Sequence, residues 1–481
     1  MVVGELAEAV DLLVIGAGPG GSDAALRAAE LGRDVVLVDA DGIDGVGGVC
    51  LRSGCIPSKA WIDLADRAHR VRSAAGRGLR IDGLSVDVTV ALKTVTETVT
   101  GLADDLTRRL EGAGVRIEQG TARFTRADQA VVEGGPTARH FQFTDVIIAT
   151  GSHPTGLPEV PWSDPRVIDS SGLLAMEEIP ERLVVVGAGY VGVELGTALA
   201  KLGSRVTLVE VADRVLPLLD RSVARPVARL LADLEVEVLT GSRAIGLDTE
   251  GVVVEKDAAT RTLDTTTVLV SIGRTPNTSD LGLEHLGLAL DAAGRIEVGR
   301  DRRASSHVAA IGDVVAGPAL AHKASAEGRV AAEALCGRHV AFEPAAIPQV
   351  VFSDPEVASA GLTVDEAKAR GCDARVTTLP LRAVPRAVLA GEAYGSAAVV
   401  WDVASGMVLG VHLAGLHASE VIAEAVLAIE MAATLDDLAL TVHAHPTVAE
   451  VLGEAARRAV EERADAVSAS KPASDAAGAP G

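Results

Sequence analysis

The sequence predicts an α/β protein in which one strand-helix-strand design is used twice and a separate α+β domain follows. The main observation is an internal repeat, because an apolar strand runs into a glycine-rich turn at 12–21 and again at 183–192. After each turn come an Ala-rich helical stretch and a second strand that ends in an acid, Asp39 or Glu210. Hydrophobic residues make up 48% of the 481 residues but aromatic residues only 2%, so the core must consist of Val, Leu, Ile and Ala. Such a core suits layered α/β folds, and the length implies several domains.

The first glycine-rich turn predicts a dinucleotide site. Glycines in this pattern permit a tight turn and the close approach of a pyrophosphate, the following helix N-terminus offers N–H donors, and the acid binds a ribose hydroxyl. A purely structural turn is the alternative, but strand, turn, helix and acid all agree with the first interpretation. The candidate residues are Gly16, Gly18, Gly20, Gly21 and Asp39.

The second turn repeats every element of the first. An acid at the end of its second strand favours the free 2′-hydroxyl of NAD and disfavours the 2′-phosphate of NADP. The candidate residues are Gly187, Gly189, Tyr190, Val191, Gly192 and Glu210. Two such sites imply two dinucleotides, and an enzyme that holds a flavin together with a nicotinamide transfers hydride.

Two closely spaced cysteines, Cys50 and Cys55, predict a redox centre. Pro57 suits the first turn of a helix that begins just after Cys55. The N-terminus of that helix would lower the pKa of a thiol and make it a competent electron relay. Lys59 lies one turn further along, on the same helical face as Cys55.

Half of a zinc site and an inert structural bridge are the alternatives for this cysteine pair. Zinc would need further Cys or His ligands at close spacing. The other two cysteines, Cys336 and Cys372, are far apart and isolated, so we expect no metal site and take both as buried small hydrophobes.

A histidine motif near the C-terminus predicts a proton-transfer pair, His445 and Glu450. A dithiol must lose protons before it can attack a disulfide, so a positioned imidazole is the expected base, and a carboxylate on its other nitrogen would fix the tautomer. Thr447 and Glu450 also fit a helix capping box, and spacing alone leaves both interpretations open. We expect His443 to be structural.

The remaining chain contains weaker signals. Residues 61–110 are expected to be helical with a cap at Asp87 or Thr89, 268–272 to be a strand, and 321–334 to be a helix. From about residue 346 short strands and then helices indicate the α+β domain. Residues 466–481 are mostly Ala, Ser, Pro and Gly and are expected to be a disordered tail.

Charge and hydropathy narrow the possible surroundings of the protein. The formal net charge of −22 argues against nucleic acid, whose phosphates need a basic surface. No apolar run approaches the ~20 residues of a membrane helix, and residues 1–10 do not form a signal peptide. We therefore expect a cytoplasmic protein with no membrane partner.

These motifs, in this order, resemble those of the class I pyridine nucleotide-disulfide oxidoreductases, and among them the dihydrolipoamide dehydrogenases. The resemblance extends from about Leu12 to about Arg458. Besides the two glycine turns, it rests on the segments 47–59, 149–152, 272–277, 312–313, 320–323 and 443–450.

The resemblance implies two Rossmann-like dinucleotide-binding domains plus a C-terminal α+β dimerisation domain. The implied boundaries are 1–152 for the first part of the FAD-binding domain, 153–274 for the NAD-binding domain, 275–345 for the second part of the FAD-binding domain, 346–465 for the dimerisation domain and 466–481 for the tail. A homodimer follows, in which the histidine pair of one subunit completes the active site of the other.

The resemblance also implies roles for single residues. Cys50 would exchange with the substrate and Cys55 would face the flavin, while His445 and Glu450 would be the base and its orienting acid. Lys59 would lie near the flavin and pair with Glu194. Further residues match cofactor contacts, with Gly273 on the NAD side and Gly48, Gly120, Thr150, Gly151, Ser152, Asp313 and Ala321 on the FAD side.

The implied activity is oxidation of a dihydrolipoamide dithiol through the Cys50–Cys55 disulfide and FAD, with reduction of NAD; a lipoyl domain of a 2-oxo acid dehydrogenase complex could carry the dithiol. Several positions depart from the family pattern. Val49 replaces a threonine, Arg52-Ser53 places a large cation near the thiols, Ser22-Asp23 stands where an aromatic residue is common, and Ser325-Ala326 replaces an acidic pair. One alternative is a related NAD(P)H-dependent reductase of another low-molecular-weight or protein disulfide. A second is a non-catalytic flavin-binding subunit.

Overall fold

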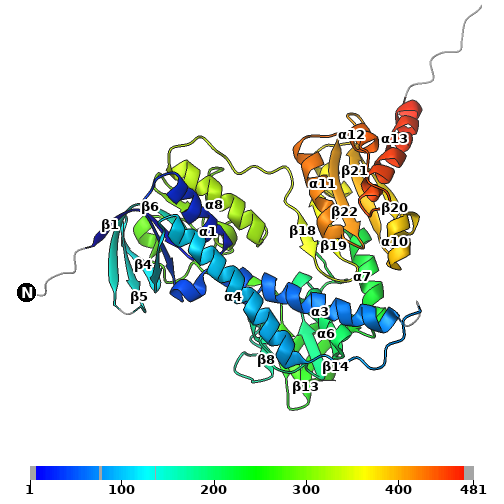
Figure 1. The fold of residues 1–481 in the computed structure, drawn as a ribbon, viewed down its shortest axis with the longest axis horizontal. Helices are drawn as coiled ribbons and strands as arrows, with labels where there is room; N and C mark the ends of the chain where they lie inside the picture. Colours follow the sequence, from blue (N-terminus) through cyan, green and yellow to red (C-terminus); the bar gives the residue numbers. More distant parts are fainter. Residues whose placement is uncertain (1–6, 75–77, 136, 471–481) are drawn as a thin grey trace, which may run out of the picture. The chain divides into compact units, whose positions relative to one another are not determined.

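The computed structural model describes residues 7–74, 78–135 and 137–470. It forms two compact units, Met1–Ile179 with Leu269–Glu343, and Pro180–Val268 with Pro344–Gly481 (Figure 1). The second unit combines the second glycine turn with the C-terminal α+β segment. The finer division into four folded segments stays a prediction.

The first unit consists mainly of a seven-stranded sheet with helices packed against it. Its elements are β1 (Glu8–Ile15), α1 (Pro19–Glu30), β2 (Val35–Asp39), η1 (Gly42–Gly45), α2 (Gly48–Arg52), α3 (Cys55–Ser73), α4 (Val88–Gly112), β3 (Arg116–Gln119), β4 (Thr121–Arg126), β5 (Gln129–Glu133), β6 (Arg139–Ile148), β7 (Ser152–Pro154), β8 (Val167–Ile168), α5 (Ser170–Leu174), β16 (Arg274–Pro276), η3 (Leu283–Leu286), β17 (Val308–Ala310), η4 (Gly312–Val314) and α8 (Ala321–Leu335).

The sheet of the first unit has the order β3-β2-β1-β6-β5-β4, with β17 also paired to β6. Strands β3, β2, β1, β6 and β17 pair in parallel, whereas β5 pairs antiparallel with both β6 and β4. Strands β1 and β2 and the end of β6 are buried runs of Val, Leu and Ile, as expected where helices cover a sheet. This arrangement confirms the predicted α/β class.

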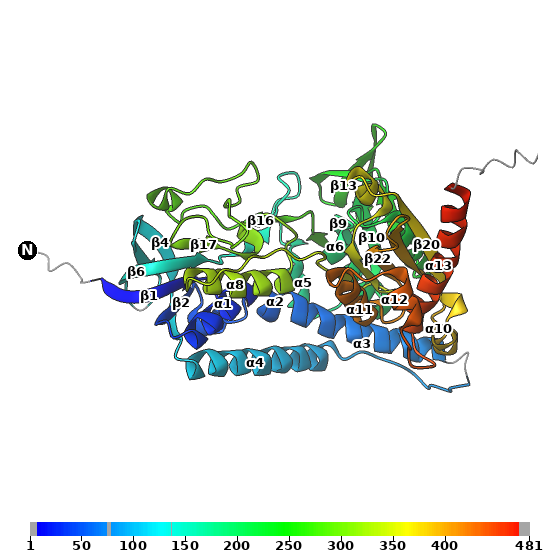
Figure 2. The ribbon, with the colours of Figure 1, turned by 90° about the horizontal axis from the view of Figure 1, so that it is seen from above.

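Helices α1 and α8 lie side by side in both views (Figures 1 and 2), and glycines allow their close contact. A Cβ atom added to Gly328 would lie 2.4 Å from the carbonyl oxygen of Gly20. One added to Gly20 would lie 3.0 Å from the carbonyl oxygen of Ala324. The first residues of α1 are therefore fixed against α8 by backbone packing that no larger side chain permits.

The second unit contains a parallel sheet, an antiparallel three-stranded sheet and an antiparallel five-stranded sheet. Its elements are β9 (Arg182–Val186), α6 (Tyr190–Leu202), β10 (Arg205–Glu210), α7 (Arg221–Asp233), β11 (Glu237–Thr240), β12 (Arg243–Leu247), β13 (Gly251–Lys256), β14 (Ala259–Asp264), β15 (Thr267–Val270, which crosses the unit boundary), β18 (Gln349–Val351), β19 (Val357–Gly361), α9 (Val364–Ala369), β20 (Ala374–Pro380), η5 (Leu381–Ala383), α10 (Pro385–Ala390), β21 (Ser396–Asp402), β22 (Val408–Ala414), α11 (Ala418–Glu430), α12 (Leu435–Leu440) and α13 (Glu450–Ser470).

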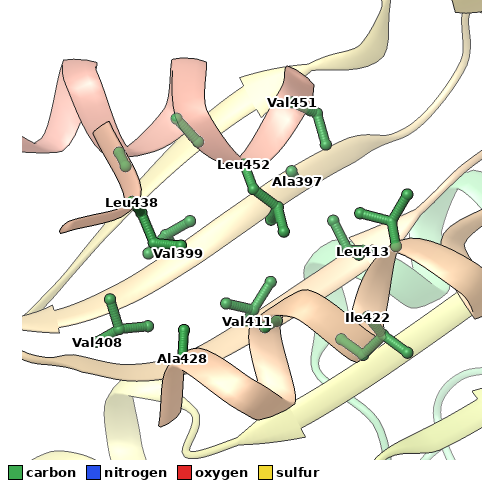
Figure 3. Packing of buried hydrophobic residues seen from close by; sticks show 14 of the residues in the cluster. Ala397, Val399, Val408, Val411, Leu413, Ile422, Ala428, Leu438, Val451 and Leu452 are labelled. Atoms are coloured by element: carbon green, nitrogen blue, oxygen red, sulfur yellow. The ribbon is translucent and has the colours of Figure 1, made fainter. Parts of the chain in front are cut away.

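The C-terminal part of this unit packs helices α11, α12 and α13 onto the sheet β18-β19-β22-β21-β20. Figure 3 shows Val399, Val411 and Leu413 of the sheet pointing toward Ile422 and Leu452 of the helices. The core is built from small aliphatic side chains, as the low aromatic content requires. It holds α13, and with it the histidine motif, against the sheet.

Most predicted elements are present, with two corrections. Residues 61–110 were expected to be helical, but α3 ends at Ser73, α4 begins at Val88, and residues 78–87 are not helical. Asp87 caps α4 by accepting a hydrogen bond from the Val90 N–H at 3.0 Å, which decides between the two predicted caps. The tail was expected from residue 466, but α13 continues to Ser470, because Ala466 is buried against the core of the C-terminal sheet. Residues 471–481 lie outside the described residues. No helix in the described part of the chain is long and apolar enough to cross a membrane.

Candidate active site

The two glycine turns share one geometry around their acids. In the first turn the Ala17 N–H donates to Asp39 at 2.8 Å, and in the second the Ala188 N–H donates to Glu210 at 2.8 Å. Each acid thus holds the residue after the first glycine of its own turn. Both acids stand at the carboxyl ends of parallel strands, where dinucleotides bind in sheets of this kind.

The second glycine of each turn faces open space. A Cβ atom added to Gly18 or to Gly189 would meet no atom within 4 Å. Gly16 is different, because its φ is +101° and its added Cβ would lie 2.3 Å from the Ala149 carbonyl oxygen. Gly16 therefore serves the turn itself, whereas Gly18 and Gly189 leave room beside the N-termini of α1 and α6. This is the free space that a pyrophosphate needs, so the residues fit two dinucleotides.

The cysteine segment is attached directly to the first turn. The Gly47 N–H donates to the Ala17 carbonyl at 2.8 Å, and a Cβ atom on Gly48 would lie 2.6 Å from the Gly18 Cα. Helix α2, which carries Cys50, begins at Gly48, and α3 begins at Cys55 itself. The first turn thereby positions the thiols relative to the dinucleotide site.

The two thiols differ in their readiness to ionise. Cys50 is partly buried and Cys55 is exposed. The pKa of Cys50 is raised, first by its hydrogen bond with Cys55, then by burial and by the charge of Cys55, while the Lys59 ammonium opposes the rise. Cys55 is the first residue of α3, and a helix N-terminus favours negative charge.

Arg52, between the two cysteines, forms hydrogen bonds with the main chain of the preceding loop. Its guanidinium donates to the carbonyl oxygens of Val46 and Ile43, each at 2.9 Å. The expectation of a large cation near the thiols stays a prediction, and these bonds fix the path of the side chain toward the preceding loop.

The candidate flavin-contact residues after β6 form one hydrogen-bonded network. Ser152 Oγ donates to Asp313 at 2.5 Å and accepts from Arg274 at 2.7 Å. The side-chain amide of Asn277 donates to the Thr150 carbonyl at 2.8 Å. The main-chain N–H of Asn277 donates to the Gly151 carbonyl at 2.9 Å. Arg274 and Asn277 were not among the predicted site residues, although the segment 272–277 that contains them was recognised.

Three further predicted contacts lie beside these features. Gly120 donates its N–H to the Asp39 carbonyl at 2.9 Å and has φ +144°, so it continues the main chain beside the first acid. Gly273, with φ +137°, accepts from the Thr155 N–H at 3.0 Å. Ala321 is the first residue of α8.

In the second unit, Glu194 lies on α6 and is 3% exposed, and its carboxylate accepts from the Phe352 N–H at 2.9 Å. This bond joins the helix after the second glycine turn to the first strands of the C-terminal sheet. The pairing of Glu194 with Lys59 stays a prediction. Tyr190 and Val191 are the first residues of α6, next to Gly189.

The histidine motif contains two imidazole-carboxylate pairs. The His445 Nδ1 donates to Glu450 Oε1 at 2.9 Å, and the second oxygen of Glu450 accepts from the Thr447 N–H at 2.8 Å. These bonds lower the pKa of Glu450. His443 is largely buried and its Nε2 lies 2.8 Å from Glu424 Oε1 on α11, so its structural role is consistent with the prediction.

Comparison with known proteins agrees with this geometry. Residues 10–328 match the pyridine nucleotide-disulphide oxidoreductase family and residues 347–456 match its dimerisation domain. The chain belongs to this family. It is 42% identical to dihydrolipoyl dehydrogenase of Geobacillus stearothermophilus, over 96% of this chain and 98% of that one, and 42% identical to the enzyme of Halobacterium salinarum, with the same coverage.

Solved structures give the same assignment. LpdA from Mycobacterium tuberculosis superposes with a TM-score of 0.86 at 28% identity, over 94% of this chain and all of that one. RclA, an HOCl-induced flavoprotein disulfide reductase from Escherichia coli, superposes with a TM-score of 0.81 at 26% identity, over 92% of this chain and 98% of that one. The predicted class I fold is confirmed, and the dimerisation domain supports a homodimer.

Proposed function

We propose that the protein is a dihydrolipoyl dehydrogenase that oxidises a dihydrolipoyl dithiol and reduces NAD⁺. FAD and NAD are its cofactors, as in its family. The observation that carries the proposal is the unequal pair Cys50 and Cys55, in which the pKa of Cys50 is raised by its neighbour while Cys55 begins a long helix. In such a pair one thiol, Cys50, can exchange with the substrate while the other, Cys55, passes electrons to the flavin.

The first step is attack by the substrate. His445 takes a proton from one substrate thiol through Nε2, since its Nδ1–H is held by Glu450. The resulting thiolate attacks Cys50 Sγ and breaks the Cys50–Cys55 bond, and Cys55 leaves as a thiolate stabilised by the helix N-terminus.

The second step closes the substrate disulfide. The remaining substrate thiol attacks the substrate sulfur that is bound to Cys50, and Cys50 leaves and takes up the second proton, consistent with its raised pKa. The Cys pair has then gained two electrons, held in the Cys55 thiolate and the Cys50 thiol. When bound, FAD would accept the electron pair from the thiolate and pass it to NAD⁺ as hydride.

The residue roles follow the same proposal. The first glycine turn with Asp39, Gly48, Gly120, Thr150, Gly151, Ser152, Asp313 and Ala321 would hold FAD, with Lys59 near its ring and Glu194 as the partner of Lys59. The second turn with Glu194, Glu210 and Gly273 would hold NAD. His445 and Glu450 would serve the Cys pair of the other subunit in the homodimer.

The substrate and the location are parts of the proposal. A lipoyl group on a 2-oxo acid dehydrogenase complex is the expected dithiol, and the cytoplasm is the expected compartment because it keeps such thiols reduced.

Anaerobic titration of the purified protein tests the proposal. Dihydrolipoamide should reduce the Cys pair and produce a long-wavelength absorption band from the Cys55 thiolate to the oxidised flavin, which C55S abolishes. C50S cannot form the disulfide, so it should show this band before any reductant is added and lose it when NADH reduces the flavin. Reduction by NADH but not by dihydrolipoamide would point to another disulfide. A protein that binds flavin but shows no band with either reductant would be a non-catalytic flavin-binding subunit.

A further inference from the structure

A buried cluster of charged side chains contacts the main chain of the turn that carries Asp313. It consists of Lys323 and Glu327 on α8 and Arg302 in the preceding loop. The Glu327 side chain is 0% exposed and that of Lys323 2%. Burying an ion pair costs free energy through desolvation, so such a cluster is weak evidence for stability alone.

The cluster binds both polar main-chain groups of one residue, Gly312. The Gly312 N–H donates to Glu327 Oε2 at 2.8 Å, and the Gly312 carbonyl accepts from Lys323 Nζ at 3.0 Å. Lys323 and Glu327 are 3.1 Å apart, and Arg302 donates to the other oxygen of Glu327 at 3.0 Å. Gly312 has φ +77°, a conformation that favours glycine.

The two segments joined by this cluster are both expected to contact FAD. Asp313 directly follows Gly312, and its carboxylate is held from the other side by Ser152 Oγ. Ala321 stands two residues before Lys323, at the start of α8. The cluster therefore sets the position of η4 relative to the first turn of α8.

The path of the lysine also depends on a glycine. A Cβ atom on Gly317, which has φ +116°, would lie 2.6 Å from the Lys323 Cε. The loop between η4 and α8 thus passes close over the lysine stem. Its ammonium is directed at Gly312 and Glu327 rather than toward solvent.

We propose that Lys323, Glu327 and Arg302 are positioning residues for the flavin, which act by fixing Gly312 so that Asp313 and Ala321 meet the cofactor together. This proposal rests on FAD binding, which belongs to the proposed function, but not on the identity of the dithiol. Part of the affinity for FAD would then depend on side chains that act through the main chain of Gly312.

The test is the dissociation constant of FAD, measured by flavin fluorescence with the apoprotein. E327L removes both acceptors and K323M removes the ammonium, and each should weaken FAD binding about tenfold or more. E327Q should recover part of the affinity, because its amide oxygen can still accept from the Gly312 N–H. Visible circular dichroism at saturating FAD should change in E327L and K323M.

The matched controls are E333L and E333Q. Glu333 lies on the same helix and pairs with Arg27 at 2.5 Å, but it does not belong to the cluster. Melting of each apoprotein separates stability from binding. The proposal is overturned if K323M and E327L bind FAD as tightly as E333L and differ only in melting temperature. If E327L does not fold, K323M and E327Q decide in the same way. A wild-type protein that binds no FAD would instead overturn the cofactor assignment.

Discussion

Glu450 holds His445 with one carboxylate oxygen, at 2.9 Å, and keeps its other oxygen for the main chain. A carboxylate only accepts hydrogen bonds, so the imidazole must donate through Nδ1, which leaves Nε2 free to take a proton. The capping and catalytic interpretations of the sequence motif are thus compatible, because one oxygen of Glu450 accepts from the Thr447 N–H while the other contacts His445.

H445Q should lower turnover with dihydrolipoamide by about 10²–10⁴-fold, the range expected for loss of a general base. Reduction of the flavin by NADH, which needs no deprotonation of a dithiol, should stay near the wild-type rate. Stopped-flow absorbance measures both half-reactions. Equal losses in both would contradict a role confined to the dithiol.

E450Q should also impair the dithiol reaction, although it conserves shape. The Gln side chain has one acceptor and one donor group, so it cannot accept from both His445 Nδ1 and the Thr447 N–H. We expect a loss in kcat of about tenfold or more, as for a residue that sets the orientation of a ligand. E454Q on the same helix is the control, since Glu454 pairs only with Arg457 among the contacts of its carboxylate in the described residues. A wild-type kcat in E450Q would reduce Glu450 to a helix cap.

C55S should make Cys50 more acidic, since Cys55 is the first cause of its raised pKa. Alkylation of reduced protein by iodoacetamide, followed by mass spectrometry of the Cys50 peptide, measures its ionisation across the alkaline range. The pH at which Cys50 reacts half-maximally should fall in C55S relative to wild type. An unchanged or higher value would mean that burial alone controls this thiol. The isolated Cys336 provides an internal control in the same digest.

Local signals explain why the sequence predicted so much of this protein. The glycine turns and Cys pair lie within short segments whose chemistry demands fixed spacing, and the repeat of strand, turn and acid identified the fold. The capping question stayed open because sequence cannot show how the two oxygens of Glu450 are divided. The helix beyond residue 465 was missed because Ala466 is held by tertiary packing, not by composition.

Contacts between distant segments could not be predicted. His443 meets Glu424 on another helix, and Lys323 and Glu327 meet the main chain of Gly312 across a loop. None of these pairs has a spacing that a pattern would reveal. The sequence shows the charge of Arg52 but not the carbonyl oxygens of Val46 and Ile43 that accept from it.

H412Q should change the acid stability of the second unit. His412 on β22 is 4% exposed, its Nε2 lies 3.2 Å from the Leu362 carbonyl oxygen, and its Nδ1 has no hydrogen-bond partner within the described chain. Burial lowers its pKa, against the opposing charges of Asp220 and Glu366. The unfolded chain therefore binds a proton more readily, so this contribution to stability is complete above about pH 6.5 and is lost as the pH falls below it.

The measurement is the melting temperature at neutral pH and at about pH 5, below the ordinary pKa of histidine. The wild-type protein should lose more stability over this interval than H412Q, by roughly 2 °C or more. H417Q is the control, because His417 is exposed at the start of α11. If H412Q and wild type show the same pH dependence, His412 is not a source of it.

Alanine at Gly18 or Gly189 should weaken the binding of one cofactor at a time without unfolding the protein. Both residues have negative φ and face open space, so a methyl group meets no protein atom. The same space is where each pyrophosphate must approach the main chain. G18A should therefore weaken FAD binding by about tenfold or more, and G189A should raise the KM for NAD by a similar factor while retaining the flavin, because one carbon is added in a tight site.

Melting of the apoproteins is the control. G18A and G189A should melt near the wild-type temperature if the space is empty of protein, whereas G16A, strained at φ +101° and in collision with Ala149, should melt lower. If G189A lost flavin and G18A kept it, the assignment of the two turns would be reversed.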